Sequence, residues 1–437
     1  MNILSTWPTF FNSNYTFGEI LSLLNFIICA LLLLMYMHHN VFTLLFLFVK
    51  AKKFPETKAQ HNYAYLVCAR NEEKVIGNLI DSIKAQDYPT ELMKIYIIAD
   101  NCTDDTAKVA REHGAVAIER FNKELIGKSY ALDELFKYVL KLDDKVEAYF
   151  VFDADNLLTK DYTTEMNKAY DSGAKLLTSY RNSKNYGSNW IASGAGLLFL
   201  RECRLMHHTR SALNLSTYVS GTGFLVDKTI VEKNGGWPYH RLIEDIEFSI
   251  DELTRGQKTE YVETAEFYDE HPRRIKASVD QRMRWCKGTH QCFSGYETKL
   301  LKAFVKRHDF SCYDLATHIF PAPVISFVWI NFLAITYGIY AICKGISWDF
   351  YYVAGLKPMI DVIWITSVYA IAVGLLVTIA DWKRIRAPWY KKILYCFTFP
   401  IYMLMYVPIS TIALFKKVKW NHISHTDDIS IEDMNEK

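Results

Sequence analysis

The strongest constraint in this sequence is a run of twenty residues near its start, Gly18 to Met37, which carries one charge, at Glu19. A helix of that length measures about 30 Å, at about 1.5 Å per residue, which is the thickness of a bilayer core. The first seventeen residues contain no Lys or Arg, so we do not expect a cleaved signal peptide. A shorter apolar run, Val41–Val49, follows, and we expect a single helix that continues to the membrane surface.

Three further apolar stretches lie in the last third of the chain: Ile319–Ile342, Met359–Ala380 and Ile393–Phe415. The loop between the last two holds five basic residues within positions 383–392. Three lysines within positions 50–53 follow the shorter apolar run Val41–Val49. Because basic loops stay on the cytoplasmic side, both segments are predicted to face the cytoplasm. Pro400 and Pro408 permit a broken or re-entrant last segment, so its topology stays open.

The polar middle of the chain, about residues 62–290, alternates short β-branched runs with amphipathic stretches. We predict strands at Tyr63–Cys68, Ile95–Ala99, Ala115–Glu119 and Ala148–Phe152, with helices at Glu72–Ala85, Thr103–His113 and Ser129–Leu142. This order indicates an α/β domain with a doubly wound, mostly parallel sheet. Ligands of such sheets bind beyond the carboxyl ends of the strands.

Composition excludes several classes of protein. With 50 basic and 48 acidic residues the net charge is +2, so we expect no nucleic-acid partner. The nine cysteines include no CxxC pair, which favours reduced thiols. The motifs of P-loop ATPases, zinc proteases and α/β-hydrolases are absent.

Polar residues with chemical potential stand at the predicted strand ends. Asp153 and Asp155 follow a strand two positions apart, so both carboxylates face one way and can take a hard divalent cation that bridges to a diphosphate. Asp100 ends another strand and is either a turn carboxylate or a contact to a nucleotide. Lys128 follows Gly127 before a helix and is either solvated or a charge partner of a diphosphate.

A second group of candidates lies further along the chain. Gln281, Arg284 and Trp285 share one helix face, where an amide, a guanidinium and an indole form a poor core but a good platform for phosphate and sugar. Glu244 and Asp245 begin a predicted helix as dipole complements, or one of them is a general base. The run 220–223 (SGTG) offers backbone to a ligand or forms only a turn.

The motifs in this order resemble the membrane-embedded family 2 glycosyltransferases, which include cellulose, chitin, hyaluronan and poly-N-acetylglucosamine synthases. The resemblance runs from about Tyr65 to Gly288 and is carried by LVCARNEE, IIADNCTDDT, IGKSYALDE, FDADN, GTGFLV, the ED of IEDIE, and QRMRW. It implies a GT-A domain on the cytoplasmic face and an inverting transfer from a UDP-sugar.

The resemblance also implies roles for individual residues. Asp245 would be the general base, and Asp153 and Asp155 would hold the donor diphosphate through Mg²⁺ or Mn²⁺. The donor would contact Arg70, Glu72, Asp100, Lys128, Asp153, Gln281 and Arg284. The acceptor would contact Gly221, Thr222, Gly223, Glu244 and Trp285.

We therefore expect a multi-pass protein of the cell membrane with a cytoplasmic catalytic domain. Its predicted parts are an N-terminal helix and anchor (1–53), a GT-A domain (54–290), interfacial helices (291–318), a membrane region (319–415) and a cytoplasmic or disordered tail (416–437), disordered from Thr426. The leading hypothesis is a synthase that extends and exports a β-linked polysaccharide. The alternatives are a transferase that adds one sugar to a membrane lipid and a non-enzymatic nucleotide-sugar sensor. Glucose and N-acetylglucosamine are the expected sugars, while linkage and oligomeric state stay open.

Overall fold

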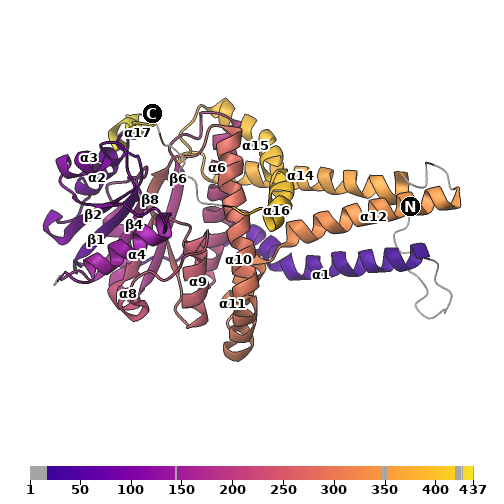
Figure 1. The fold of residues 1–437 in the computed structure, drawn as a ribbon, viewed down its shortest axis with the longest axis horizontal. Helices are drawn as coiled ribbons and strands as arrows, with labels where there is room; N and C mark the ends of the chain where they lie inside the picture. Colours follow the sequence, from indigo (N-terminus) through magenta and orange to yellow (C-terminus); the bar gives the residue numbers. More distant parts are fainter. Residues whose placement is uncertain are drawn as a thin grey trace.

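The computed structural model describes residues 17–142, 145–345, 348, 352–418, 425 and 427–436. It shows an α/β domain from which long helices project on one side (Figure 1). The sheet has eight strands in the order β3-β2-β1-β4-β7-β6-β8-β5. The strands are β1 (Tyr63–Ala69), β2 (Met93–Asp100), β3 (Val116–Arg120), β4 (Ala148–Asp153), β5 (Leu157–Leu158), β6 (Leu176–Ser183), β7 (Phe224–Asp227) and β8 (Glu260–Asp269).

The four strands expected from the sequence form one parallel half of this sheet. β1 pairs with β2 and β4, and β2 pairs with β3, all in parallel. The other half is mixed, because β7 runs antiparallel to both β4 and β6, whereas β6 and β8 are parallel. The predicted α/β fold with a mostly parallel sheet is confirmed in the half that ends at Asp100 and Asp153.

Helices cover both faces of the parallel half, which explains why its strands are apolar throughout. Tyr65 and Val67 of β1 face a core formed with α2 and α5, while Leu66 faces a second core formed with α4 and Trp237. Burial of each large apolar side chain contributes about 1.5–3 kcal/mol, so both faces hold the strand ends in place. The helices of this domain are α2 (Ile76–Lys84), α3 (Thr106–Glu112), α4 (Lys128–Val139), α5 (Tyr162–Asp171), α6 (Trp190–Arg201), α7 (His208–Ala212), α8 (Lys228–Asn234), α9 (Glu244–Thr254), α10 (Ile275–Arg307) and α11 (Phe310–Ile319).

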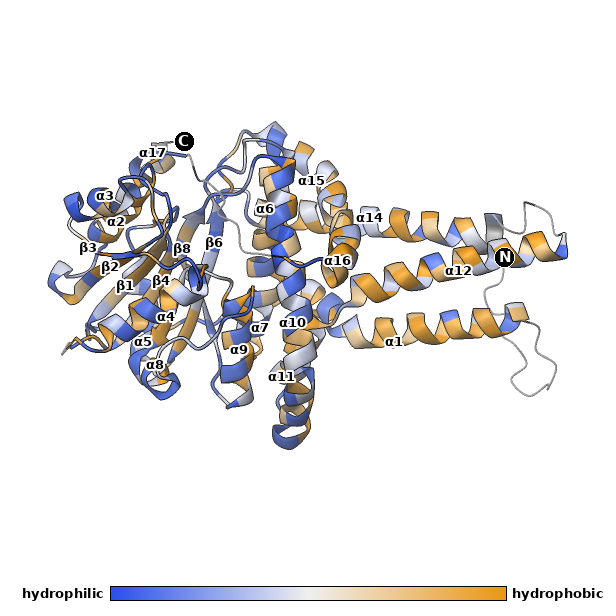
Figure 2. Ribbon diagram, viewed as in Figure 1, coloured by the Kyte–Doolittle hydropathy of each residue, from blue (hydrophilic) through white to orange (hydrophobic). Residues whose placement is uncertain are grey.

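Four segments of the described chain are long and apolar enough to cross a membrane. Three of them, α1 (Phe17–Leu45), α12 (Ala322–Lys344) and α14 (Lys357–Ala380), project from the domain and are apolar along their length (Figure 2). As expected, α1 continues without a break from the first apolar run into the second.

The fourth segment is broken, as its prolines allow. It consists of α15 (Trp389–Leu404) and α16 (Tyr406–Phe415), which meet at Met405. α10 holds both parts, because Arg282 donates a hydrogen bond to the Tyr402 carbonyl at 2.8 Å and His290 donates one to the Ser410 carbonyl at 3.0 Å. These contacts tie the segment to the α/β domain.

The prediction of a disordered tail from Thr426 is wrong for residues 427–436. This stretch lies on the α/β domain and ends in a short helix, α17 (Ile431–Glu436). Ile431 and Met434 are buried against Leu157 and Tyr268. These two apolar contacts hold a segment whose acidic composition is otherwise typical of disorder.

Candidate active site

A cavity of about 1830 Å³ extends from the carboxyl ends of the parallel strands into the group of apolar helices. We call its two parts the sheet end and the helix end. The sheet end is lined by Arg70, Glu72, Asp100, Lys128, Asp153, Asp155, Gly221, Glu244, Asp245, Gln281, Arg284 and Trp285. The helix end is lined by Ser22, Asn25 and Leu32 of α1, Trp329, Leu333 and Tyr337 of α12, and Met359, Val362 and Ile363 of α14.

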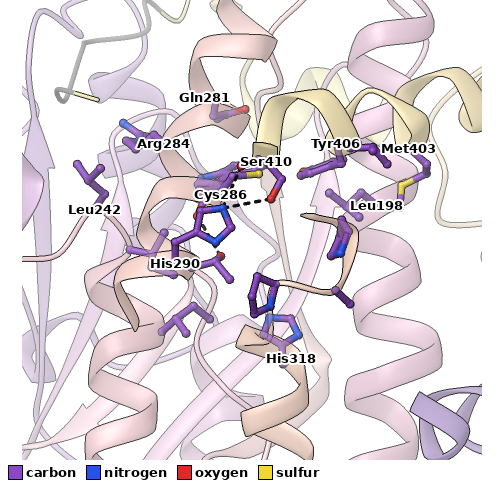
Figure 3. A pocket seen from close by; sticks show the side chains of 18 of the residues that line it. Leu198, Leu242, Gln281, Arg284, Cys286, His290, His318, Met403, Tyr406 and Ser410 are labelled. Atoms are coloured by element: carbon purple, nitrogen blue, oxygen red, sulfur yellow. Dashed lines mark hydrogen bonds between the residues drawn. The ribbon is translucent and has the colours of Figure 1, made fainter. Parts of the chain in front are cut away.

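The stretch between the two ends is formed by side chains from α6, α10, α11 and α16. Figure 3 shows Gln281 and Arg284 near the sheet end, with His290 bonded to Ser410 and with His318 further along. Elements far apart in the sequence therefore enclose one continuous space.

Two residues expected at the acceptor lie outside the lining of this cavity. Thr222 is buried, accepts a hydrogen bond from the Asp153 amide at 2.9 Å and donates one to Asn156. Gly223 has a φ of +65°, and a Cβ there would collide with the Phe267 ring. Both residues contact the end of β4, because Thr222 bonds the Asp153 amide and the Gly223 amide donates to the Val151 carbonyl.

Asp100 is buried at the end of β2 and is already paired. Arg120 donates a hydrogen bond to its carboxylate at 2.6 Å and reaches Glu134 at 2.7 Å. Burial raises the pKa of Asp100, and the Arg120 guanidinium opposes that rise. Asp100 therefore lines the cavity with its carboxylate held in one orientation by Arg120. No sequence motif indicated this supporting role of Arg120.

Lys128, the first residue of α4, connects that helix to the end of β4 and to the loop at Gly221. It forms an ion pair with Asp153 and donates a hydrogen bond to the Gly221 carbonyl at 2.6 Å. Burial lowers the pKa of Lys128, but Asp153 and Glu244 outweigh this effect and raise it, so the ammonium stays charged. A fixed cation beside Asp153 suits a phosphate-bearing ligand.

The carboxylates around Asp155 have the chemistry of a divalent-cation site. Burial raises the pKa of Asp155 to about 7, opposed by His425 and reinforced by Asp269 and Asp153. Within the described part of the chain, Glu72 Oε2 is buried without a hydrogen-bond partner. Carboxylate oxygens are the ligands that Mg²⁺ and Mn²⁺ prefer, so Asp153, Asp155 and Glu72, which line the same end of the cavity, have the chemistry to hold such an ion.

A second cluster, His38, His39 and Asp314, has ligand atoms within 4.8 Å of one another. However, Arg210 already binds the Asp314 carboxylate through two hydrogen bonds, at 2.7 and 3.0 Å. Both oxygens of Asp314 are therefore already bonded, so the cluster is better explained as a polar contact that holds α1 against α11.

Asp245 lies in the first turn of α9, half-buried, facing the loop at Gly221. A Cβ on Gly221, whose φ is +80°, would lie 3.6 Å from Asp245 Oδ2. Burial raises the pKa of Asp245 to about 7, and the neighbouring charge of Glu244 adds to the rise. A carboxylate with a pKa near neutrality is well suited to accept a proton from a substrate.

The helix face predicted to carry Gln281, Arg284 and Trp285 belongs to α10. Gln281, Arg284 and Trp285 line the cavity, while Arg282 points the opposite way and bonds the Tyr402 carbonyl. Burial lowers the pKa of Arg284, opposed by Glu244 and Asp153. Trp285 meets the Phe199 ring edge-on, with centroids 5.7 Å apart, at the boundary toward the helix end.

Sequence reasoning missed several residues of the cavity wall. Arg181 pairs with Asp269 at 2.5 Å, and its guanidinium lies over the Phe199 ring at 3.7 Å from the centroid. Arg210 and His318 line the central stretch, and His425 lines the sheet end. These residues belong to no spaced motif, because only the tertiary fold brings them to the cavity.

Comparison with known proteins defines the class of this site. The model of the family described as "Glycosyltransferase like family 2" matches residues 61–288, more than half of the chain. The chain belongs to this family, and it is a glycosyltransferase with a GT-A domain and apolar helices on both sides.

Individual relatives are more distant. The chain is 25% identical to a probable glycosyltransferase, YdaM, of Bacillus subtilis over 264 residues, covering 55% of this chain and 58% of that protein. It is 26% identical to a beta-monoglucosyldiacylglycerol synthase of Nostoc over 272 residues, covering 60% and 56%. The chain thus spans less than three fifths of these relatives' length.

Among solved structures, the chain is similar to the mannosyltransferase PcManGT from Pyrobaculum calidifontis in complex with GDP-Man and Mn²⁺. The identity is 14% and the TM-score 0.49, over 88% of this chain and 98% of that one.

Proposed function

We propose that this glycosyltransferase transfers one sugar from a nucleoside diphosphate sugar to the hydroxyl group of a membrane lipid. The donor would be a UDP-sugar carrying glucose or N-acetylglucosamine. We propose that the catalytic domain lies on the cytoplasmic face of the plasma membrane, and the basic segments at positions 50–53 and 383–392 support that orientation. The observation that carries this proposal is the continuity of the cavity from Asp245 to the apolar helices.

The dimensions of the helix end suit a lipid chain. α1 lines the cavity from His39 to Ser22, which corresponds to about 26 Å along its axis. That exceeds half of a bilayer core of about 30 Å, so a lipid chain in one leaflet can lie along the helix end. A lipid lying there would present its polar group toward Trp285 and Asp245.

The sheet end can carry out the chemistry. The acceptor oxygen would attack the anomeric carbon while the bond from that carbon to the diphosphate oxygen breaks on the opposite face. Asp245 would take the hydroxyl proton, and the bonding electron pair would leave with the nucleoside diphosphate. Arg284 and Lys128 would bind the charge that develops on the leaving group. Attack from the opposite face inverts an α-linked donor to a β-glycoside.

A divalent cation, Mg²⁺ or Mn²⁺, would be held by Asp153 and Asp155, with Glu72 beside them. When bound, it neutralises the diphosphate charge and so makes the leaving group more stable. Arg70, Asp100 and Gln281 would complete the donor contacts, and Gly221, Glu244 and Trp285 those of the acceptor. The name of the Nostoc relative, a synthase of monoglucosyldiacylglycerol, supports a lipid acceptor.

The experiment that tests the proposal reads product size and solubility together. The purified protein, in vesicles of total membrane lipid with Mg²⁺ and Mn²⁺, is incubated with a panel of radiolabelled UDP-sugars. We expect a single glycolipid that extracts into chloroform, in step with UDP release. A water-soluble polymer would instead support the polysaccharide synthase, and nucleotide-sugar binding without any turnover would support the sensor.

A further inference from the structure

The end of the chain returns to the sheet end of the cavity. We call His425 and residues 427–436 the C-terminal strap. His425 Nδ1 lies 2.8 Å from Glu72 Oε1, although the two residues are 353 positions apart in the sequence. His425 lines the same cavity as Asp153 and Asp155. The strap therefore contributes a side chain to the site, and no motif of the sequence suggested it.

Several polar contacts anchor the strap at Asp427, two positions after His425. The backbone amide of Asp427 donates to Glu270 at 3.2 Å, and its carboxylate pairs with Arg273. Lys184 joins the strap to the site directly, since its ammonium donates to the carbonyls of both Asp155, at 3.0 Å, and Asp427, at 3.4 Å.

The far part of the strap is anchored by apolar contact. Ile431 and Met434 are buried against Leu157, which lies just past Asp155 in the chain, and against Tyr268. Asn78 adds a hydrogen bond to Asp428 at 2.7 Å. Polar and apolar contacts thus hold the strap beside the sheet end of the cavity.

The surroundings of His425 explain why a donor group is needed there. Asp153 and Asp269 are paired with Lys128 and Arg181, but Glu72 is buried and has His425 as its ion-pair partner. A buried carboxylate without a donor costs more than the hydrogen bond itself contributes, and it repels an anionic diphosphate. His425 therefore holds Glu72 in a defined position at the sheet end of the cavity.

We propose that the C-terminal strap is a wall of the nucleotide-sugar site and that His425 is the residue in it that positions Glu72. This rests on the proposed donor class, a nucleoside diphosphate sugar. An undocked strap would leave the sheet end of the cavity open to water, and the loss of the His425 side chain would leave Glu72 without its hydrogen-bond donor. Both changes should weaken nucleotide binding before they affect folding.

The test measures nucleotide affinity in the full-length protein with Mn²⁺ present. UDP and GDP are titrated calorimetrically into the wild type, His425→Ala, and Ile431→Asp, which undocks the strap from a distance. We expect both variants to bind the preferred nucleotide about tenfold more weakly, the size of a lost hydrogen bond to a charged group. His425→Gln, which keeps an N–H donor, should recover most of the affinity, and Glu432→Gln, exposed on the same helix, should match the wild type.

The outcomes separate this inference from the proposed function. Thermal unfolding of each variant shows whether the α/β domain is intact. If the wild type binds a nucleotide and the two variants bind it equally well, the strap is not part of the site. Tighter binding in Ile431→Asp would show that the strap blocks the site, which also overturns the inference. A wild type that binds neither nucleotide would refute the donor class, and the strap inference with it.

Discussion

The two ends of the cavity are built in different ways. At the sheet end, charged groups come from strand ends and helix starts, and most of them have fixed partners, such as Arg120 for Asp100 and Lys128 for Asp153. At the helix end, apolar side chains of α1, α12 and α14 dominate. A polar contact within this end is the hydrogen bond that Trp329 donates to Asn25 at 3.0 Å.

This difference indicates how each end selects its ligand. Fixed charges recognise one arrangement of phosphate and sugar, so a small displacement at the sheet end costs much activity. An apolar groove recognises length and width, so the helix end should tolerate substitution as long as its volume is kept. The following predictions test that contrast, beginning with the largest effect.

Replacement of Asp245 should have the largest effect. Asp245→Asn removes the proposed base without changing its shape, so sugar transfer should fall by at least about 10²-fold while UDP binding is retained. Single-turnover transfer and calorimetric UDP titration measure the two properties. Glu244→Gln is the matched control and should lose less. An active Asp245→Asn beside an inactive Glu244→Gln would move the base by one residue.

Asp155→Asn should weaken the response to metal. Transfer by the wild type should stop when EDTA removes divalent cations and return on addition of Mn²⁺ or Mg²⁺. Because Asp155 supplies a proposed ligand, the variant should need at least about tenfold more metal for half-maximal transfer. UDP release is followed during a metal titration. Near-normal release by the wild type in EDTA would exclude the metal site.

At the helix end, we expect a substitution to lower activity when it adds bulk to the cavity wall. Val362 lines the cavity and is 50% exposed, while Ile360, on the same helix and 53% exposed, does not line it. Val362→Trp should lower kcat/KM for the lipid about fivefold, which matches about 1 kcal/mol of overpacking, with UDP affinity unchanged. Ile360→Trp should behave as the wild type. Equal activity of the two variants would argue against a lipid at this end.

The smallest effect concerns pH. Because Asp245 must be ionised to accept a proton, kcat/KM should rise with pH up to its pKa of about 7 and then level off. The charge of Glu244 raises that pKa, so Glu244→Gln should lower it and move the acid limb toward lower pH. Rates measured between pH 5 and pH 9 would test the shift. A limb that moves upward would show that Glu244 does not act on Asp245 by its charge.

The sheet end was largely predictable from the sequence, because periodicity marks buried strands and the polar groups follow them at once. Asp100 and Asp153 end β2 and β4 as expected, and Gln281 and Arg284 share a helix face because their spacing matches one helical turn. Thr222 and Gly223 were harder to place. The left-handed φ values of Gly221 (+80°) and Gly223 (+65°) turn the chain sharply, so Gly221 lines the cavity while Thr222 is buried against Asp153 and Asn156.

Other features depend on contacts between distant parts of the chain. His425 stands in an acidic segment whose composition is typical of disorder, and contacts with distant residues fix this segment to the domain, among them the burial of Ile431 and Met434. Arg181 and Arg120 occur without a motif, since each is placed by the strand on which it lies. The cavity itself could not be predicted, because its wall joins elements as far apart in the sequence as α1 and α14.

The proposed function requires that a lipid hydroxyl reach Asp245 from between α1, α12 and α14. A structure of the protein in a lipid bilayer, with UDP and the glycolipid product bound, tests it most directly. The account predicts lipid chains along Leu32, Leu333 and Val362, with the glycosidic oxygen within about 2.6–3.2 Å of an Asp245 carboxylate oxygen. A product whose chains lie outside the cavity, or whose sugar lies away from Asp245, would contradict it.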